Sequence, residues 1–449
     1  MTPATPSARP SAPGTWVYAV IVAAALAGVV WGVLAGSQPV GTRPAVLVSA
    51  ADPAWYAALP ADPEAATKAY LARVPPETRE RAEAFAHQWY MVLALRLAVM
   101  IASTLLIMNT RLATRMRDVA FRVSRRAWQQ DAVFAAEFLA VLFLLGLPVE
   151  VFAGFVRWRL AGLSHATFPQ WLSDYLIQWA VNLVFYLVGL VAIMALIRRR
   201  PASWTLWATA VYVALYATYM LVSPLYIEPL FNRYTALPEG PPRDAILSLA
   251  RANGVPANEV YVRDASRQSV ILNAQVSGLG GTARITLDDN TIASTPPAEI
   301  EMVMAHEIGH YVLRHGFKQT VLGGLVMGAG FLFVAWTLRR MLLLHGKRWA
   351  VSGPGDVAAL PLFWFLFSLW GYLALPANNA IQREDEAEAD LFGLNASRQP
   401  LALAEFLIRD ADTHPREPNA FVEWALYDHP SEAHRIAMAM RWRAEHLPR

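Results

Sequence analysis

The sequence has no cysteine and little charge. Its 449 residues include no Cys and only three lysines, at Lys68, Lys318 and Lys347. Without cysteine the chain can form no disulfide, no catalytic thiolate and no Cys-ligated metal site. Any metal must therefore be held by His, Asp or Glu. Charged residues make up 16% of the chain, against about 25% in average soluble domains.

Apolar residues are abundant instead. They make up 55% of the chain, and the mean hydropathy is +0.31. This composition excludes a disordered chain, a coiled coil or a plain soluble enzyme as a description of the whole protein, and it favours a multi-pass membrane protein. The net charge is +3 and comes almost entirely from Arg. With so few charges in total we expect no nucleic-acid partner, and the arginines instead mark cytoplasmic loops.

Seven apolar stretches have the length of about 20 residues that a membrane helix needs. They are Trp16–Leu34, Trp89–Met108, Val133–Phe155, Leu176–Ile197, Trp204–Tyr226, Thr320–Leu338 and Val357–Leu375. We interpret the first as an uncleaved anchor rather than a signal peptide, because its charged leader is weak and more spans follow. The polar segment 36–88 is expected to form an exposed helical loop or subdomain. The chain then divides into a membrane region, 1–226, and a C-terminal region, 227–449, that includes the last two spans.

The short loops predict the orientation in the membrane. The loops after the second, fourth and sixth spans carry clusters of basic residues: Arg111, Arg115, Arg117, Arg122, Arg125, Arg126, Arg198, Arg199, Arg200, Arg339, Arg340, Lys347 and Arg348. The short loop on the other side has only Arg157 and Arg159. Positive residues in short loops stay in the cytoplasm. The N-terminus is therefore expected inside, and 227–319 and the C-terminal tail outside, in a periplasm-like space.

Three charged residues fall within or near the apolar stretches. Arg96 lies in the second, Glu137 in the third and Glu150 near the end of the third. They either face a polar cavity between helices or extend toward the membrane surface from near a helix end.

The main chemical motif is H-E-x-x-H at His306, Glu307 and His310. The preceding residues favour a helix from Pro297, and the cap candidates are Ser294 and Thr295. Residues i and i+4 share one helix face, so both imidazoles can reach one metal ion. Glu307 is close enough to hydrogen-bond a metal-bound water, whose pKa zinc lowers and whose proton a carboxylate can remove.

A third metal ligand is expected, because catalytic zinc usually has three protein ligands and one open position. The acidic run just after the last span offers Glu384, Glu386 and Glu388, and composition does not choose among them. If Glu386 is the ligand, helical spacing places Asp390 on the same face, where it could accept a hydrogen bond from a ligand histidine.

Other segments could complete an active site. Val270–Ser277 and Ala283–Leu287 read as strands joined by a Gly-rich turn, and an edge strand beside a metal can pair with an extended peptide. In the tail, His429 or Arg435 could stabilise an oxyanion. His315 and His345 flank the sixth span, and we expect them to be interfacial residues without a role.

Together these motifs resemble the type I CAAX prenyl protease family of integral-membrane zinc metalloproteases. The similarity runs from about Tyr226 to Arg435. It is carried by Ile227–Gly240, by Asn273-Ala274 with Arg284–Asp289, by Ala305–His310, by the E-x-x-A-D motif Glu386–Asp390, and by His429-Pro430 with Arg435. The order and spacing of the motifs and the seven spans agree with the family.

The resemblance implies a mainly α, seven-helix membrane protein around a large water-filled chamber, with a small α+β, zincin-like catalytic region that contains a β-hairpin. It implies one Zn²⁺ ion held by His306, His310 and Glu386, with Glu307 as general base. It also implies roles for three other groups of residues: Asp390 bonded to a ligand histidine, His429 and Arg435 facing the substrate or the oxyanion, and Asn273 and Ala274 beside the bound peptide.

The resemblance also frames the substrate and the location. In eukaryotic members the catalytic region faces the cytosol, whereas the charge count here places it outside. The Ala- and Arg-rich composition without Cys looks bacterial, so we expect a bacterial plasma membrane, where prenylated substrates are generally lacking. The expected partners are the lipid bilayer and a peptide or protein substrate, either a CaaX-like or lipidated C-terminal peptide or a membrane or envelope protein. A transporter or channel, or an inactive scaffold, is the alternative. It is disfavoured because the spans carry no strong ion pathway and the H-E-x-x-H motif is intact.

Overall fold

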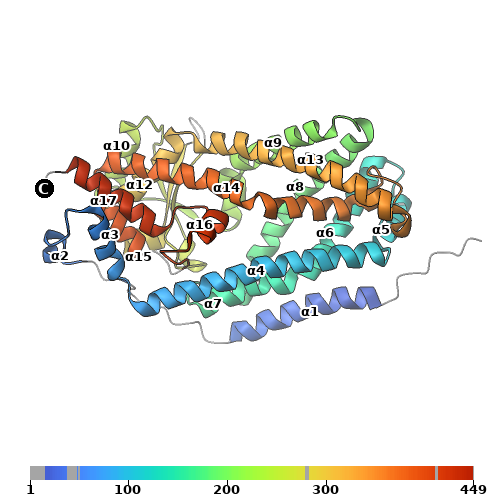
Figure 1. Cartoon of the computed structure of the whole chain (residues 1–449), viewed down its shortest axis with the longest axis horizontal. Coiled ribbons are helices and arrows are strands. Elements are labelled where there is room, and N and C mark those ends of the chain that lie inside the picture. The colour runs from blue at the N-terminus through green and yellow to red at the C-terminus, as the bar shows by residue number, and fades with distance from the viewer. Residues whose placement is uncertain (1–15, 38–47, 49–50, 279–282, 410–412, 448–449) are drawn as a thin grey trace, which may run out of the picture.

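The structure is a computed structural model, and it describes residues 16–37, 48, 51–278, 283–409 and 413–447. Seven helices in this part of the chain are long and apolar enough to cross a membrane, which confirms the predicted number of spans. They run side by side along the long axis of the molecule, with a polar region at one end (Figure 1). The spans are built on α1 (Trp16–Ser37), α4 (Pro76–Asn109), α6 (Ala127–Val151), α8 (Phe168–Arg199), α9 (Trp204–Val222), α13 (His315–Trp349) and α14 (Leu360–Ser397).

Several spanning helices are longer than their apolar stretches predict. The helix of the second span begins at Pro76 rather than near Trp89, and that of the seventh continues to Ser397 rather than ending near Leu375. The additional turns are polar, so hydropathy alone predicts where the membrane span ends but not where the helix ends. In α14 the extension carries the acidic run from the membrane into the catalytic region.

Two spans change helical form where they enter the polar region. α6 contains Pro148 and continues through a π-helical turn, η1 (Phe152–Val156), into α7 (Arg157–Leu160). α9 continues through a second π-turn, η2 (Ser223–Ile227), into the short η3 (Glu228–Leu230). Proline removes a backbone donor and forces the preceding turn to adjust, which explains irregular turns near Pro148 and Pro224.

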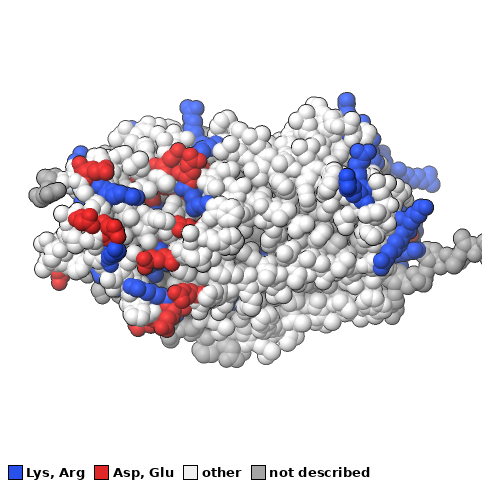
Figure 2. All heavy atoms as spheres, in the orientation of Figure 1, with Lys and Arg blue, Asp and Glu red and all other residues white. Residues whose placement is uncertain are grey.

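The two ends of the bundle differ in charge. At the end that carries α5 (Leu112–Val123), the visible charges are almost all Lys and Arg, whereas acidic and basic residues are mixed at the other end (Figure 2). A broad band without visible charge separates the two ends on this face (Figure 2). α5 buries Leu112, Ala113, Met116 and Ala120 against the bundle and exposes Arg122. It is therefore an amphipathic helix capping the basic end.

The end of the bundle opposite α5 is built around a small sheet with strand order β1-β2-β4-β3. The strands are β1 (Tyr234–Ala236), β2 (Val260–Arg263), β3 (Ala274–Ser277) and β4 (Arg284–Asp288). β2 and β4 are parallel, and the other two pairs are antiparallel. The predicted pairing of the segments 270–277 and 283–287 is confirmed as β3 with β4, but β3 starts only at Ala274, and most of the Gly-rich turn lies outside the described residues.

Helices cover this sheet and join the tail to the start of the chain. α10 (Pro241–Ala252) and α12 (Pro297–Val312) pack on the sheet through one apolar cluster. A second cluster joins α3 (Pro63–Ala72), α15 (Pro400–Arg409) and α17 (Glu432–His446). The segment 36–88 thus contributes helices, as predicted. These helices belong to the N-terminal region, 1–226, but pack against the tail of the C-terminal region. The remaining short elements are α2 (Pro53–Ala57), η4 (Ala265–Arg267), α11 (Asp289–Ser294), η6 (Val357–Ala359) and α16 (Ala420–Leu426).

The charged residues of the second and third spans are not equivalent. Arg96 on α4 donates from Nε and Nη2 to the two carboxylate oxygens of Glu150 on α6, at 2.9 and 2.7 Å. This ion pair inside the bundle matches the polar-cavity alternative rather than extension of Arg96 to the membrane surface. Glu137 is half-buried, and its Oε2 has no hydrogen-bond partner among the described residues.

Candidate metal centre

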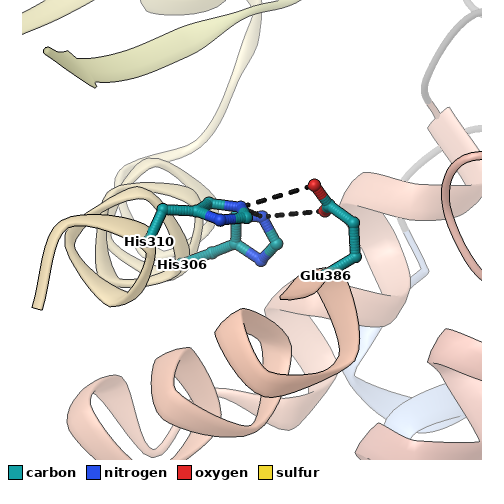
Figure 3. Close-up of side chains that lie close together, drawn as sticks. All are labelled: His306, His310 and Glu386. Carbon is teal, nitrogen blue, oxygen red and sulfur yellow. Dashed lines mark hydrogen bonds and ion pairs between the residues drawn. The ribbon is translucent and has the colours of Figure 1, made fainter. Parts of the chain in front are cut away.

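Three potential metal ligands converge where α12 meets α14. His306 and His310, one turn apart on α12, point their Nε2 atoms toward each other at 3.0 Å. Glu386 of α14 faces them, with Oε2 at 3.3 Å from His306 Nε2 and Oε1 at 3.4 Å from His310 Nε2 (Figure 3). The three residues meet from helices that lie more than 70 positions apart in the sequence, so only the packing of α12 on α14 creates the group.

The spacing of these atoms fits a bound metal ion. A tetrahedral zinc ion with bonds of about 2.0–2.1 Å separates neighbouring ligand atoms by about 3.3 Å. The observed separations are 3.0, 3.3 and 3.4 Å. The Oε2 atom of Glu386 is buried and makes no hydrogen bond within the described residues, as expected for an atom that faces a cation. The residues therefore fit a metal ion with one open position.

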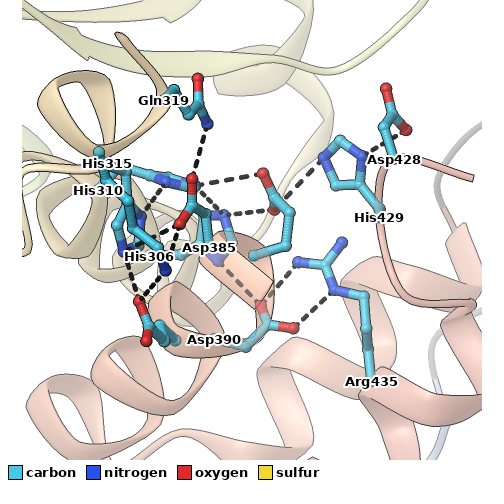
Figure 4. Close-up of polar contacts among 12 residues, drawn as sticks. His306, His310, His315, Gln319, Asp385, Asp390, Asp428, His429 and Arg435 are labelled. Atoms are coloured by element: carbon cyan, nitrogen blue, oxygen red, sulfur yellow. Dashed lines mark hydrogen bonds and ion pairs between the residues drawn. The ribbon is translucent and has the colours of Figure 1, made fainter. Parts of the chain in front are cut away.

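Asp390 and Arg435 fix the orientation of His306. The Nδ1 of His306 lies 2.9 Å from Asp390 Oδ1, so Nδ1 donates to the carboxylate while Nε2 faces the other ligands. Asp390 is fully buried and accepts two further hydrogen bonds of 2.7 Å from Arg435 (Figure 4). The predicted contact of Asp390 with a ligand histidine is present in the structure. Arg435 binds Asp390 with Nε and Nη2 and thereby helps to hold His306 in its orientation.

His315 plays the corresponding part for His310, contrary to the expectation that it is an interfacial bystander. It is only 2% exposed, and its Nδ1 lies 2.8 Å from His310 Nδ1. Its Nε2 lies 3.1 Å from Glu388 Oε2. Arg314, between α12 and α13, has a left-handed backbone with φ of 59°, and this sharp turn folds His315 back onto the end of α12. This turn is not predictable from the local sequence, because the residue in the left-handed conformation is not a glycine.

The structure distinguishes the three glutamates of the acidic run. Glu386 faces the histidine pair, while Glu384 and Glu388 lie 3.7 and 3.3 Å from Lys318 Nζ. Asp385, fully buried, lies 2.8 Å from the same Nζ and accepts a hydrogen bond from Gln319. Successive carboxylates on a helix point in different directions, so one run supplies both the candidate ligand and an ion-pair cluster behind His310.

The electrostatics of α12 suit the two roles predicted there. Burial lowers the pKa of His310 to about 4, and the neighbouring His306 adds to this shift, so His310 is neutral and able to ligate a metal. Burial also raises the pKa of Glu307 to about 7, with Glu386 acting in the same direction and His306 opposing both. The Glu307 side chain has no hydrogen-bond partner among the described residues. Its carboxylate is thus available to a water or a substrate.

His429 reaches the site from the loop between α16 and α17. Its Nε2 lies 3.3 Å from Glu386 Oε2, and its Nδ1 lies 2.9 Å from Asp428 Oδ1 (Figure 4). Burial lowers its pKa, but the hydrogen bond to Asp428 and the charge of Glu386 outweigh burial, so the pKa is raised overall. About half of the His429 side chain is exposed, at 49%. It can therefore present a proton on the open side of the metal group.

The edge strand lies beside this group. β3 begins at Ala274, ends the sheet and packs against α12. Asn273, just before it, is held through its backbone: its N–H donates to Thr291 Oγ1 at 2.8 Å, and its carbonyl accepts from Asp288 N at 3.0 Å. The opposite edge of β3 pairs with β4, so one edge of the strand is left without a strand partner in the described residues.

The cap of α12 differs from the sequence prediction, and the close contact of α12 with Gly393 was not predicted. The predicted cap residues do not cap the helix: α12 begins at Pro297 after Pro296, and Ser294 Oγ donates to Asn290 O. Proline suits the first turn because its missing N–H would be unpaired there. Gly393 of α14 packs directly against the helix, since a Cβ there would lie 3.1 Å from the backbone nitrogen of His306.

Comparison with known sequences agrees with this geometry. The sequence model of peptidase family M48 matches residues 239–443, and the model described as CAAX prenyl protease N-terminal, five membrane helices, matches residues 64–233. The chain belongs to peptidase family M48. Residues 239–443 of this family member contain His306, His310 and Glu386, and the resemblance to the type I CAAX prenyl proteases is confirmed.

Individual relatives of known name or structure support this family assignment. A Bacillus subtilis protein named uncharacterized metalloprotease YhfN is 29% identical over 67% of this chain and 72% of its own length. The CAAX prenyl protease 1 homolog of Dictyostelium discoideum is 27% identical over 59% of this chain and 62% of its own length. The crystal structure of S. mikatae Ste24p superimposes with a TM-score of 0.69 at 19% identity, covering 96% of this chain and 100% of that one, so the two share a fold.

This family member is a multi-pass membrane metalloendopeptidase. The family implies a metal ion and a peptide or protein substrate, and the seven apolar helices embed the chain in a bilayer. The comparisons favour this function over the transporter and scaffold alternatives. A pocket of about 330 Å³ between α9, α13 and α14 includes in its wall Gln319, which donates a hydrogen bond to Asp385.

Proposed function

We propose that the metal is zinc, that His306, His310 and Glu386 bind it, and that Glu307 is the general base for peptide hydrolysis. The observation that carries this proposal is the set of separations of 3.0–3.4 Å among the three ligand atoms. Two imidazoles and one carboxylate form a donor set typical of catalytic zinc. When bound, zinc would act as a Lewis acid toward the peptide carbonyl and would lower the pKa of water.

The protein residues supply proton transfer, stabilisation of negative charge and positioning of a ligand. Glu307 takes a proton from the attacking water and passes it to the leaving nitrogen, for which its raised pKa of about 7 is suitable. His429, on the open side of the site, donates a hydrogen bond to the oxygen that gains negative charge. Arg435 acts indirectly, because it donates a hydrogen bond to Asp390, which in turn accepts one from His306.

The substrate is proposed to bind as an extended strand on β3. Its backbone pairs with the unpartnered edge that begins at Asn273 and Ala274, which positions a peptide bond over the metal group. Backbone pairing gives affinity with little sequence preference, so other contacts must select the substrate.

We propose that the protein lies in a bacterial plasma membrane with the catalytic end in the periplasm. The support is the charge distribution, since the basic end of the bundle is opposite the metal group (Figure 2). Two substrate classes fit this placement: CaaX-like or lipidated C-terminal peptides, by analogy with the relatives named CAAX prenyl protease, and membrane or envelope proteins.

Metal exchange tests the proposal. Purified protein treated with a chelator should lose hydrolysis of internally quenched peptides, and about one equivalent of Zn²⁺ should restore it. Mg²⁺ should not, because it prefers oxygen ligands in octahedral geometry. Hydrolysis that survives complete removal of metal would refute the proposal. In the same assay, a lipidated C-terminal peptide and an unfolded envelope protein distinguish the two substrate classes.

A further inference from the structure

Arg157, at the start of α7, is a buried cation with no carboxylate partner among the described residues. It is 5% exposed, and its Nη1 donates to the backbone carbonyl of Phe85 at 3.1 Å. Its Nε is buried without a hydrogen-bond partner, and the described residues give the guanidinium no ion pair and no other hydrogen bond. Buried charges are normally paired, so an arginine with five donors and one protein acceptor is prepared for a missing anion.

The surroundings of Arg157 orient the guanidinium without neutralising it. The guanidinium lies 3.9 Å from the Phe85 ring centre and 5.6 Å from that of Trp89. Arg96 lies 5.7 Å from the same Trp89 ring but is paired with Glu150. Two cations and one carboxylate thus surround Trp89, and the unmatched positive charge is that of Arg157. Aromatic faces stabilise a cation and hold it in place but supply no hydrogen-bond acceptor in its plane.

Arg157 lies beyond the N-terminal end of the edge strand. The Phe85 ring packs in one apolar cluster with Leu163, Val270 and Ile271. The N–H of Val270 donates to the Leu163 carbonyl at 3.1 Å, and the chain then runs through Asn273 into β3. The same cluster therefore connects Arg157 to the segment that leads into the proposed peptide-binding edge.

A second set of contacts connects Arg157 with the loop that carries His429. The His414 ring lies 5.4 Å from that of Tyr427, two residues before His429. Burial lowers the pKa of His414, Asp428 opposes this shift, and the positive charges of His429 and Arg157 lower it further. The positive charge of Arg157 therefore acts on His414, whose ring contacts Tyr427 at the start of the loop that carries His429.

The direction of a bound peptide follows from the sheet. Antiparallel pairing is the commoner arrangement, and β3 already pairs with β4 in this way. A peptide antiparallel to β3 runs toward the N-terminal end of that strand, so its C-terminal residues approach Val270 and then Arg157. The unmatched cation therefore lies where the end of such a peptide would be.

We infer that Arg157 binds a carboxylate of the substrate near its C-terminal end, either the terminal carboxylate or an acidic side chain. This inference rests on the proposed function and assigns a specificity determinant to it. A guanidinium donates charge-assisted hydrogen bonds to a carboxylate in its own plane, and the described residues give the Nη2 of Arg157 no acceptor. The site would favour cleavage close to the end of a chain over cleavage in the middle of one.

Peptide binding to the zinc-loaded Glu307→Gln protein tests the inference without relying on turnover. Three fluorescent peptides of one sequence would be compared by anisotropy: one with a free C-terminal carboxylate, one with a C-terminal amide, and one amide that ends in Glu. We expect the free acid or the Glu-amide to bind at least about tenfold more tightly than the plain amide, and the stronger of the two identifies the source of the carboxylate. The preference should vanish in Arg157→Gln and persist in part in Arg157→Lys.

Arg159→Gln is the matched control, because it removes a guanidinium from the same helix that donates to the Ala166 and Gly36 carbonyls. It should keep the preference for a carboxylate. Equal binding of all three peptides, no binding of any of them, or a preference that survives Arg157→Gln would overturn the inference. If Arg157→Gln does not fold, the preference of Arg157→Lys decides, and it must fall at least about threefold. Carboxylate-dependent binding without cleavage by the wild-type protein would count against the proposed function alone.

Discussion

At the scale of single residues, each of the two histidines proposed to bind the metal is held by its own partner. His306 donates to Asp390 at 2.9 Å, and His310 contacts His315 at 2.8 Å. A histidine that ligates metal through Nε2 needs an acceptor for its Nδ1–H, and this acceptor fixes both the tautomer and the orientation of the ring. For His306 the acceptor is a carboxylate, and for His310 it is a second imidazole bonded to Glu388.

This arrangement predicts a specific effect of replacing His315. His315→Phe should lower zinc affinity by about 10–100-fold, because His310 loses its acceptor. His315→Asn should restore most of the affinity, since the Asn Oδ1 can occupy the place of Nδ1. The measurement is a competition titration of zinc against a chromophoric chelator, with the melting temperature of the metal-free proteins as a control for packing. Equal zinc affinity in wild type and His315→Phe would show that His315 does not orient His310.

The residues of the site were predictable from sequence to different degrees. The pair His306 and His310 follows from helical spacing alone, and the contact of Asp390 with a histidine follows from the choice of Glu386. The contact of His315 with His310 does not, because it depends on a left-handed Arg314 between two helices. Arg435 was expected to face the substrate or the oxyanion, and the structure adds a contact that was not predicted, in which a buried carboxylate 45 positions away binds two of its nitrogens. Such long-range pairing is set by tertiary packing and leaves no local pattern.

At the scale of elements, the contact between α12 and α14 sets the geometry of the metal group. Both helices approach closely at glycines: a Cβ on Gly393 would meet Met302 Cε at 2.6 Å, and one on Gly309 would meet Phe392 Cδ1 at 3.1 Å. His306 and His310 lie on one helix and Glu386 on the other, so a change in the distance between the two helices would change the separation of Glu386 from the histidines.

Gly393→Ala should therefore disturb both stability and metal binding. Overpacking of this kind costs about 1–3 kcal/mol, and a forced separation of the helices should weaken zinc binding as well. Gly371→Ala is the control on the same helix, because no atom lies within 4 Å of its added Cβ. It should be neutral or slightly stabilising. Thermal unfolding and zinc titration of both variants provide the measurements, and a Gly393→Ala protein with wild-type values in both would contradict the account of this contact.

Elements of different kinds were also unequally predictable. The seven spans were evident because each needs a long apolar run. The strands β1 and β2 were not predicted, because they span only Tyr234–Ala236 and Val260–Arg263 and are too short for an alternating pattern. The polar extensions of α4 and α14 were also not predicted, because they continue a helix beyond the membrane, where hydropathy no longer indicates it.

At the scale of the whole molecule, charge divides the protein into two ends. The end with α5 shows almost only basic residues, and the catalytic end mixes both signs (Figure 2). Short loops rich in arginine resist translocation across the membrane. The proposed orientation thus follows from the sequence and is consistent with the distribution of charge over the folded surface.

The absence of cysteine makes this orientation directly testable. Ser294→Cys introduces one exposed thiol just before α12, and Val123→Cys introduces one at the end of α5, where Val123 is 65% exposed. In intact cells a membrane-impermeant thiol reagent should label Ser294→Cys, whereas Val123→Cys should react only after lysis. The reverse pattern would place the catalytic end in the cytoplasm and would return cytosolic C-terminal processing to first place among the substrates.

The central claim is that a metal group built from α12 and α14 hydrolyses peptides with Glu307 as its base. Measurement of zinc content together with peptide hydrolysis, in wild type and Glu307→Gln, tests it most directly. The account predicts about one zinc per chain in both proteins and a loss of hydrolysis of at least about a hundredfold in the variant. A Glu307→Gln protein that hydrolyses peptides at the wild-type rate, or a wild-type protein that binds no zinc, would contradict it.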